Sequence, residues 1–205
     1  ASRPEAAGFE ALMFDRKRNL IGAMQRLAKG SQSVVLPVDP PHVAPGACLI
    51  QIKSLAPPNS PNLDSAFTKI KIVKLVAPTL KSFVLSKGLG EVKWSEVKTC
   101  TEYQLQLVDS TGATFDVPGS FPKQALSTSI GLPPILAAGP VHIRIRALAA
   151  NAIASDWSAA SAQAIEKLQT PAISHQHFAA DQLLATWAPV AGARTYLVEF
   201  TGTDG

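Results

Sequence analysis

The 205-residue sequence is poor in charge and in long apolar runs, and each shortage excludes a class of protein. Charged residues make up 17% of the chain and hydrophobic residues 46%, a balance that excludes an intrinsically disordered protein. No apolar run reaches about 18 residues, which excludes a membrane-spanning helix. The sequence opens with neither an initiator Met nor a basic-then-apolar signal segment, so we expect a processed or excised piece.

Motifs that carry chemistry are also scarce. The two cysteines, Cys48 and Cys100, lack metal-ligand spacing, and we expect free thiols. No Gly-rich phosphate loop, nucleophile elbow or metalloprotease helix occurs. His175 and His177 are two residues apart, but two histidines without a third ligand favour an exposed pair over a metal site. The sequence therefore predicts no enzyme activity, no metal and no cofactor.

What the sequence does contain is an internal repeat of 93 residues without gaps. Ten of thirty positions are identical between residues 46–75 and residues 139–168. A period of this length is typical of a whole β-sandwich domain rather than of a solenoid repeat. Repeated pairs include Trp94 and Trp187, Tyr103 and Tyr196, Gly46 and Gly139, Leu55 and Leu148, Leu75 and Leu168, and Pro78 and Pro171.

Strand patterns recur at matching places within the repeat. Residues 48–53, 103–108 and 141–147 alternate apolar and polar positions, which predicts half-buried strands. Residues 19–29 give two competing signals. Their apolar spacing, with Gly30 behind it, favours a short helix, whereas the repeat places an edge strand and a loop there.

These residues resemble the fibronectin type III repeat. That family carries a core Trp on its second strand, a Tyr on its third and an alternating sixth strand that ends in Ala, and Trp94, Tyr103 and residues 141–147 match this pattern. Residues 155–158 match its Ser-rich approach to the last strand. One departure is that Val141 and Cys48 stand where the family usually has a Tyr. The resemblance implies an all-β chain of tandem fibronectin type III-like, immunoglobulin-like β-sandwiches, and a different immunoglobulin-like family is the alternative.

The repeat register divides the chain into three parts. Residues 1–75 match a unit from its third strand onward, residues 76–168 a complete unit, and residues 169–205 the first strands of a further unit. We expect Trp94 and Trp187 in cores, and Trp157 in a core rather than at an exposed edge.

The two incomplete ends have two explanations. Either the chain is a fragment and residues beyond it complete both ends, or the ends complete one another within a chain or head-to-tail between chains. The second explanation predicts that residues 181–187 pair beside residues 1–75.

The resemblance implies a non-catalytic structural or binding module, acting as a spacer, adhesion or assembly element of a larger protein. Abundant alanine favours a bacterial or phage source. Protein partners or self-association are expected, at an extracellular, cell-surface or virion location. The alternatives are an accessory module of a secreted carbohydrate-active enzyme, or a module that binds an anionic polymer. The small basic clusters do not predict specific nucleic-acid binding. The candidate anion-binding face is Lys53, Lys69, Lys71, Arg144 and Arg146.

Overall fold

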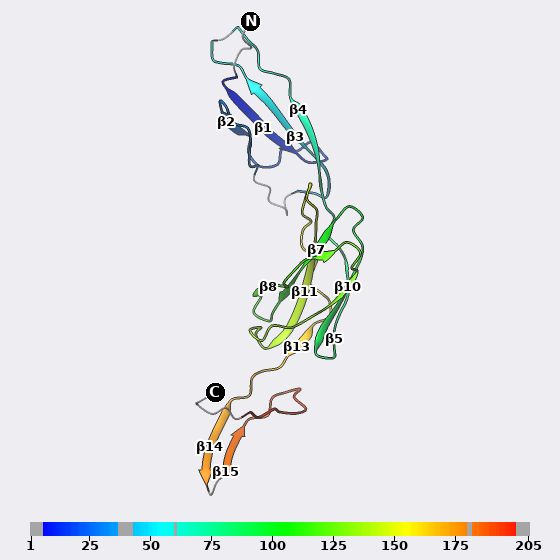
Figure 1. Cartoon of the computed structure of the whole chain (residues 1–205), viewed down its shortest axis with the longest axis vertical. Helices are drawn as coiled ribbons and strands as arrows, with labels where there is room; N and C mark the ends of the chain where they lie inside the picture. The colour runs from blue at the N-terminus through cyan, green and yellow to red at the C-terminus, as the bar shows by residue number, and fades with distance from the viewer. Residues whose placement is uncertain (1–5, 37–42, 60, 180–181, 200–205) are drawn as a thin grey trace.

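The computed structural model describes residues 6–36, 43–59, 61–179 and 182–199, and all of its regular elements are strands. The strands form three groups that follow one another along the longest axis of the molecule (Figure 1). The all-β fold predicted from the sequence is confirmed. None of the described residues forms a helix of the length and apolar content needed to cross a membrane.

The first group is a five-stranded sheet with the strand order β12-β4-β3-β1-β2. We call its four N-terminal strands the N-terminal sheet. They are β1 (Gly8–Phe14), β2 (Gln25–Ala28), β3 (Gly46–Leu55) and β4 (Thr68–Lys74). The fifth strand, β12 (Ala152–Ile153), comes from much later in the chain and runs parallel to β4.

The helix considered for residues 19–29 is wrong, and the edge strand is right. β2 pairs antiparallel with β1, with Leu27 opposite Phe9. Leu20 and Met24 stay 48% and 41% exposed, so no neighbouring surface covers the apolar face that a helix would have presented. Pairing instead satisfies the backbone groups along the edge of β1, which a helix would have left open.

The middle unit is a sandwich of two sheets around one core. One sheet has the order β10-β6-β5, and the other has the order β13-β11-β7-β8 with β9 also paired to β7. Its strands are β5 (Leu80–Ser86), β6 (Leu89–Trp94), β7 (Glu102–Val108), β8 (Thr114–Asp116), β9 (Phe121–Pro122), β10 (Ser127–Ile130), β11 (Gly139–Leu148) and β13 (Ile165–Lys167).

Trp94 lies at the centre of this core, as predicted, and is 0% exposed. Its ring meets the rings of Tyr103 and Phe121 edge-on, with centroids 5.5 and 6.2 Å away. The alternation of β11 turns its apolar side chains inward, and Ile143 and Ile145 are both 0% exposed. The period-two pattern therefore identified the buried face of this strand correctly.

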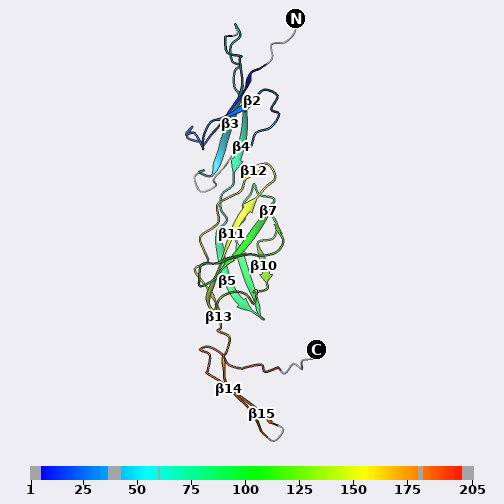
Figure 2. The ribbon, with the colours of Figure 1, turned by 90° about the vertical axis from the view of Figure 1, so that its left-hand side faces the viewer.

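The third group is a hairpin of β14 (Ile173–Ala179) and β15 (Gln182–Trp187), which we call the C-terminal hairpin. Its two strands pair only with each other, and the hairpin and the N-terminal sheet lie at opposite ends of the molecule (Figure 2). Completion of the N-terminal sheet by the same chain is therefore wrong. Residues 188–199 form no strand, because the described residues offer them no strand partner.

Candidate functional site and interaction surfaces

An ion pair between a buried lysine and a partly exposed aspartate joins the N-terminal sheet to the middle unit. The Lys74 side chain is 0% exposed, and its Nζ donates to both carboxylate oxygens of Asp156 at 2.8 and 2.9 Å. The same ammonium donates to the Val43 carbonyl oxygen at 2.5 Å. A buried ammonium is tolerated only with such charge and hydrogen-bond partners. This pair therefore favours one relative placement of β4 and the Asp156 loop.

Apolar side chains cross the same junction in both directions. Leu75 follows β4 yet belongs to the core of the middle unit, where it is 1% exposed. Ile153 belongs to the middle unit yet packs against the small core around Met13 and Cys48 in the N-terminal sheet. The Leu75 N–H donates to the Ile153 carbonyl oxygen at 3.0 Å, so the exchange is also hydrogen-bonded.

Three serines, each three residues after the last, attach the segment beyond β12 to the edge of β11. Each serine Oγ accepts a hydrogen bond from a β11 amide at 2.9 to 3.1 Å. Each serine N–H donates back to the carbonyl of the same β11 residue at 2.8 to 3.0 Å. The pairs are Ser155 with Ala147, Ser158 with Ile145, and Ser161 with Ile143. The spacing leaves two residues between successive attachments.

Asp156 and Trp157 are the two residues between the first and second of these serines. Asp156 reaches Lys74, while the Trp157 ring lies against the guanidinium groups of Arg146 and Arg144, 4.6 and 5.1 Å from its centroid. The expectation that Trp157 is a core residue is wrong, because it is half-buried against the outward side chains of β11. Cation–π contact with two arginines replaces core packing here.

The predicted anion-binding residues fall on two units, and several already have partners. Arg144 and Arg146 stack on Trp157 and donate to glutamine side chains of β7. Lys53 pairs with Asp64 at 3.1 Å and lies 3.7 Å from Glu10.

Lys69 and Lys71 are exposed on β4 and make no ion pair among the described residues. Within the described part of the chain they are thus the two members of the predicted face without an ion pair, and anion binding stays a prediction.

Among the residues that the structure describes, neither the histidine pair nor the thiols gather enough ligands for a metal site. His175 and His177 are exposed on β14, with ring centroids 6.3 Å apart and ring planes inclined by 18°. Within the described part of the chain, no group of three or more His, Cys, Asp or Glu could hold a metal ion. Cys48 and Cys100 are free thiols, as expected, and burial raises the pKa of Cys48.

Two titratable groups of the middle unit support its structure. The buried Tyr103 hydroxyl accepts a hydrogen bond from the Val97 amide at 2.9 Å, and burial raises the pKa of Tyr103 to about 12. The Asp109 carboxylate accepts hydrogen bonds from Thr111 and from the Ala137 amide, which hold its pKa below the ordinary value. Both groups stabilise loops rather than offering a reactive site.

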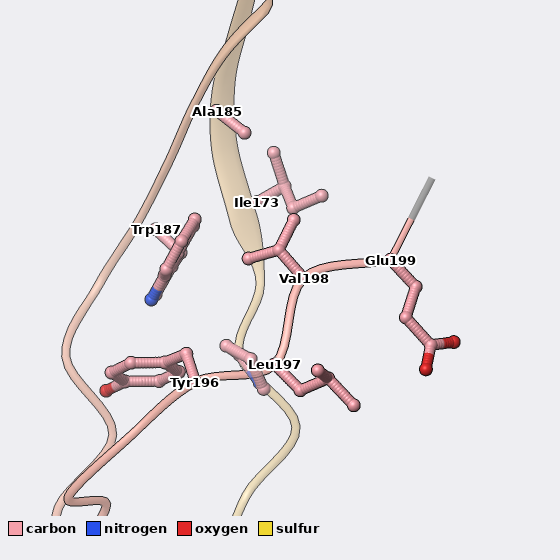
Figure 3. A pocket seen from close by; sticks show the side chains of 8 residues that line it. Ile173, Ala185, Trp187, Tyr196, Leu197, Val198 and Glu199 are labelled. Atoms are coloured by element: carbon pink, nitrogen blue, oxygen red, sulfur yellow. The ribbon is translucent and has the colours of Figure 1, made fainter. Parts of the chain in front are cut away.

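The C-terminal hairpin carries an open apolar hollow of about 220 Å³. Figure 3 shows the Trp187 and Tyr196 rings side by side with Ile173 and Val198 close by. Their ring centroids are 5.4 Å apart, and the Val190 amide donates to the Tyr196 hydroxyl at 2.8 Å. Both contacts repeat those of Trp94, Tyr103 and Val97 at positions 93 residues later.

The strand order decides the fold of the middle unit. Trp94 ends its second strand, Tyr103 lies on its third, and the alternating β11 pairs beside β7 in the sheet opposite β5 and β6. The middle unit is a fibronectin type III-like sandwich. The serine-attached segment before β13 also agrees with that resemblance.

No family model and no curated protein matches the chain. Among solved structures it is similar to a two-domain fibronectin type III segment of chicken tenascin, at 13% identity over 81% of this chain and 95% of that one, with a TM-score of 0.35. A tetra-tandem repeat from the extending region of a large adhesion protein is 16% identical over 83% and 45% of the two chains, with a TM-score of 0.32. The BSP domain of a biofilm associated protein is 18% identical over 81% and 26%, with a TM-score of 0.29.

Proposed function

We propose that this chain is a non-catalytic structural module, a spacer and assembly element that holds sandwich units end to end within a larger adhesion-type protein. The observation that carries the proposal is the junction at Lys74, where the ion pair of this buried lysine, a parallel strand ladder and exchanged core residues act together. Neighbouring domains move relative to one another by default unless their interface is substantial. A junction with these three contacts keeps the separation of the units constant, which is what a spacer requires.

The charge pattern supports the same function. The buried Lys74 ammonium tolerates little displacement from Asp156, because a buried charge is costly when its compensation is lost. Lys167 is the repeat equivalent of Lys74, and its Nζ donates to the Pro134 carbonyl oxygen at 2.8 Å, much as Lys74 donates to Val43. The last strand of each unit thus ends in a lysine that donates to a loop carbonyl oxygen. Such a lysine can form the same kind of junction each time one unit follows another.

Distance measurements between spin labels test the spacer function. Labels at Lys71→Cys and Lys93→Cys report on the two sides of the junction, since both side chains are exposed and the native cysteines are buried. We expect one narrow distance distribution for the parent protein and a broad one after Asp156→Asn, which removes the Asp156 carboxylate charge that Lys74 pairs with across the junction.

A matched control removes an ion pair that does not cross the junction. Asp64→Asn breaks the contact to Lys53 within the N-terminal sheet, and we expect the distribution to stay narrow. A broad distribution in the parent protein, or one that Asp156→Asn leaves unchanged, contradicts a rigid spacer.

Binding of an anionic polymer is the second proposed function, and the exposed ammonium groups of Lys69 and Lys71, which have no ion pair among the described residues, favour it. We expect retention on immobilised heparin to weaken with rising salt and to weaken further in Lys69→Gln/Lys71→Gln. Arg144→Gln serves as the control, because that guanidinium is already occupied by Trp157 and Gln106. Equal retention of all three proteins would contradict binding through these lysines.

A further inference from the structure

A second hollow, of about 210 Å³, lies on the N-terminal sheet, on the face that points away from its small apolar core. The strand register places Phe14 opposite Leu49, and Gln51 opposite Lys69. Leu49 and Gln51 are two residues apart on β3, so these side chains share the outward face. We call this site the basic hollow, and its lining residues are Phe14, Asp15, Arg18, Leu49, Gln51 and Lys69.

The complete middle unit keeps the same face open to solvent. Val108 pairs with His142 there as Phe14 pairs with Leu49 in the N-terminal sheet. Both Val108 and His142 are half-exposed, because the core of the sandwich lies on the other side of β7 and β11. A ligand can therefore reach the basic hollow whether or not a second layer covers the opposite face.

The turn that follows β1 has the same hydrogen bonds as the turn that follows β7. The Asp15 N–H donates to the carbonyl oxygen four residues later at 2.9 Å, and the Arg18 N–H donates to the Asp15 carbonyl oxygen at 3.0 Å. Asp109 and Gly112 make the same two bonds in the middle unit, both at 3.0 Å. Arg18 thus occupies the place of Gly112.

Arg18 is strained at this place, whereas a glycine is not. The φ angles of Arg18 and Gly112 are 68° and 83°, in the left-handed region where a Cβ atom is unfavourable. Strained residues of this kind cluster at binding and active sites. The arginine in this turn therefore indicates a function for its side chain, which is exposed and has no ion pair among the described residues.

The lysines of the same face are also specific to the N-terminal sheet. Lys69 and Lys71 have Ala162 and Ala164 as their counterparts 93 residues later. The middle unit thus has the same backbone at this place without the charges. Since one fold forms with and without them, folding does not account for the three cations.

The carboxylate among the lining residues has a structural function. Asp15 accepts two hydrogen bonds from Asn19, one from its backbone N–H at 2.8 Å and one from its side-chain amide at 2.9 Å. These bonds hold the pKa of Asp15 below its ordinary value. Asp109 accepts bonds within its own turn in the same way. Two lining cations, Arg18 and Lys69, therefore face a single carboxylate that the turn itself requires.

We propose that the basic hollow binds one acidic sugar unit of a polysaccharide, a ring that carries a carboxylate or a sulfate group. Arg18 and Lys69 bind the anionic group through charge-assisted hydrogen bonds. Phe14 and Leu49 supply the apolar part of the lining for the C–H face of the ring, and the Gln51 amide donates to and accepts from its hydroxyls. The inference rests on the second proposed function, anionic-polymer binding, and names its site and its ligand class.

Isothermal titration calorimetry of the 205-residue chain with three probes tests the proposal. The probes are an oligogalacturonate, which carries carboxylates, a dextran sulfate oligosaccharide, which carries sulfates, and a polyphosphate of matched charge. A polyphosphate has no apolar face and leaves the Phe14 side chain unused. We expect at least one acidic sugar to bind more tightly than the polyphosphate by more than about tenfold.

Two variants copy the middle unit and so separate binding from folding. Arg18→Gly gives the turn the residue of its counterpart, and it should keep the thermal stability while weakening sugar binding by more than about tenfold. Phe14→Val copies Val108 and should weaken sugar binding while leaving polyphosphate binding unchanged. Lys93→Gln removes an exposed charge from the middle unit and is the control, with unchanged affinity for every probe.

Three results would overturn the inference. They are a parent chain that binds neither acidic sugar, an Arg18→Gly protein that binds them as tightly as the parent, and a polyphosphate that binds as tightly as the sugars. Retention on heparin that Lys69→Gln/Lys71→Gln weakens, but Arg18→Gly and Phe14→Val do not, refutes the basic hollow and leaves anionic-polymer binding standing. A parent chain that also fails to bind heparin refutes both.

Discussion

Replacing Trp94 by alanine should destabilise the middle unit more than any other single change in its core. The indole is 0% exposed and contacts Tyr103 and Phe121 edge-on. Burial of about 200 Å² of aromatic surface, at roughly 25 cal/mol per Å², contributes about 5 kcal/mol.

Two effects reduce that figure. The unfolded chain already buries part of its apolar surface. In addition, the Trp94 Nε1 has no hydrogen-bond partner among the described residues, so its removal relieves a buried unsatisfied donor. We expect a loss of about 3 to 5 kcal/mol in the free energy of unfolding.

Urea denaturation is the assay, and its control is the repeat equivalent of the same residue. Trp157 is kept in both variants and reports on the middle unit through its fluorescence. Trp187→Ala removes a half-buried indole from the C-terminal hairpin and should change the unfolding of the middle unit by less than about 0.5 kcal/mol, because distant sites act independently. Equal losses in the two variants, or a loss below about 1 kcal/mol for Trp94→Ala, would refute the assignment of Trp94 as the central core residue.

Three further outcomes are expected of the middle unit. Because the pKa of Tyr103 is raised to about 12 in the folded state, the free energy of unfolding should fall as pH rises from about 10 to about 12, and Tyr103→Phe should flatten that dependence in urea titrations. Because the pKa of Asp109 is lowered in the folded state, its contribution to the free energy of unfolding is complete above the ordinary pKa and is lost as pH falls below about 4. If Asp109→Asn loses stability below about pH 4 as steeply as the parent protein, this expectation is contradicted. Ser158→Ala should cost about 1 kcal/mol and speed hydrogen exchange of the Ile145 amide. Ser110→Ala is the control, because its hydroxyl bonds to the Ala138 carbonyl oxygen before the start of β11 and not to the Ile145 amide.

The sequence determined the elements whose signals are local or repeated. Period-two alternation identified β7 and β11 and their inward faces, since successive side chains of a strand point to opposite faces. The 93-residue period placed Trp94 and Tyr103 together in one core and predicted the paired strands β14 and β15. These features follow from neighbouring residues or from a copied pattern, so no distant contact was needed to find them.

Tertiary structure decided the features that depend on residues far apart in the chain. Residues 25–28 became a strand because β1 offered an edge, although their local spacing favours a helix as well. Lys74 and Asp156 are 82 positions apart, and only the placement of β12 beside β4 brings them together. The one sequence signal at that site was the repeated lysine, which alternation places on the buried face of β4.

The position of Trp157 was also decided by tertiary structure. Its neighbours Ser155 and Ser158 attach to β11, and this attachment turns the indole outward onto two arginines instead of into the core. Hydrophobicity alone assigns a large aromatic residue to the interior, because that choice removes the most apolar surface from water. The backbone hydrogen bonds on either side determined its position, and they form only when the segment lies along the finished edge of β11.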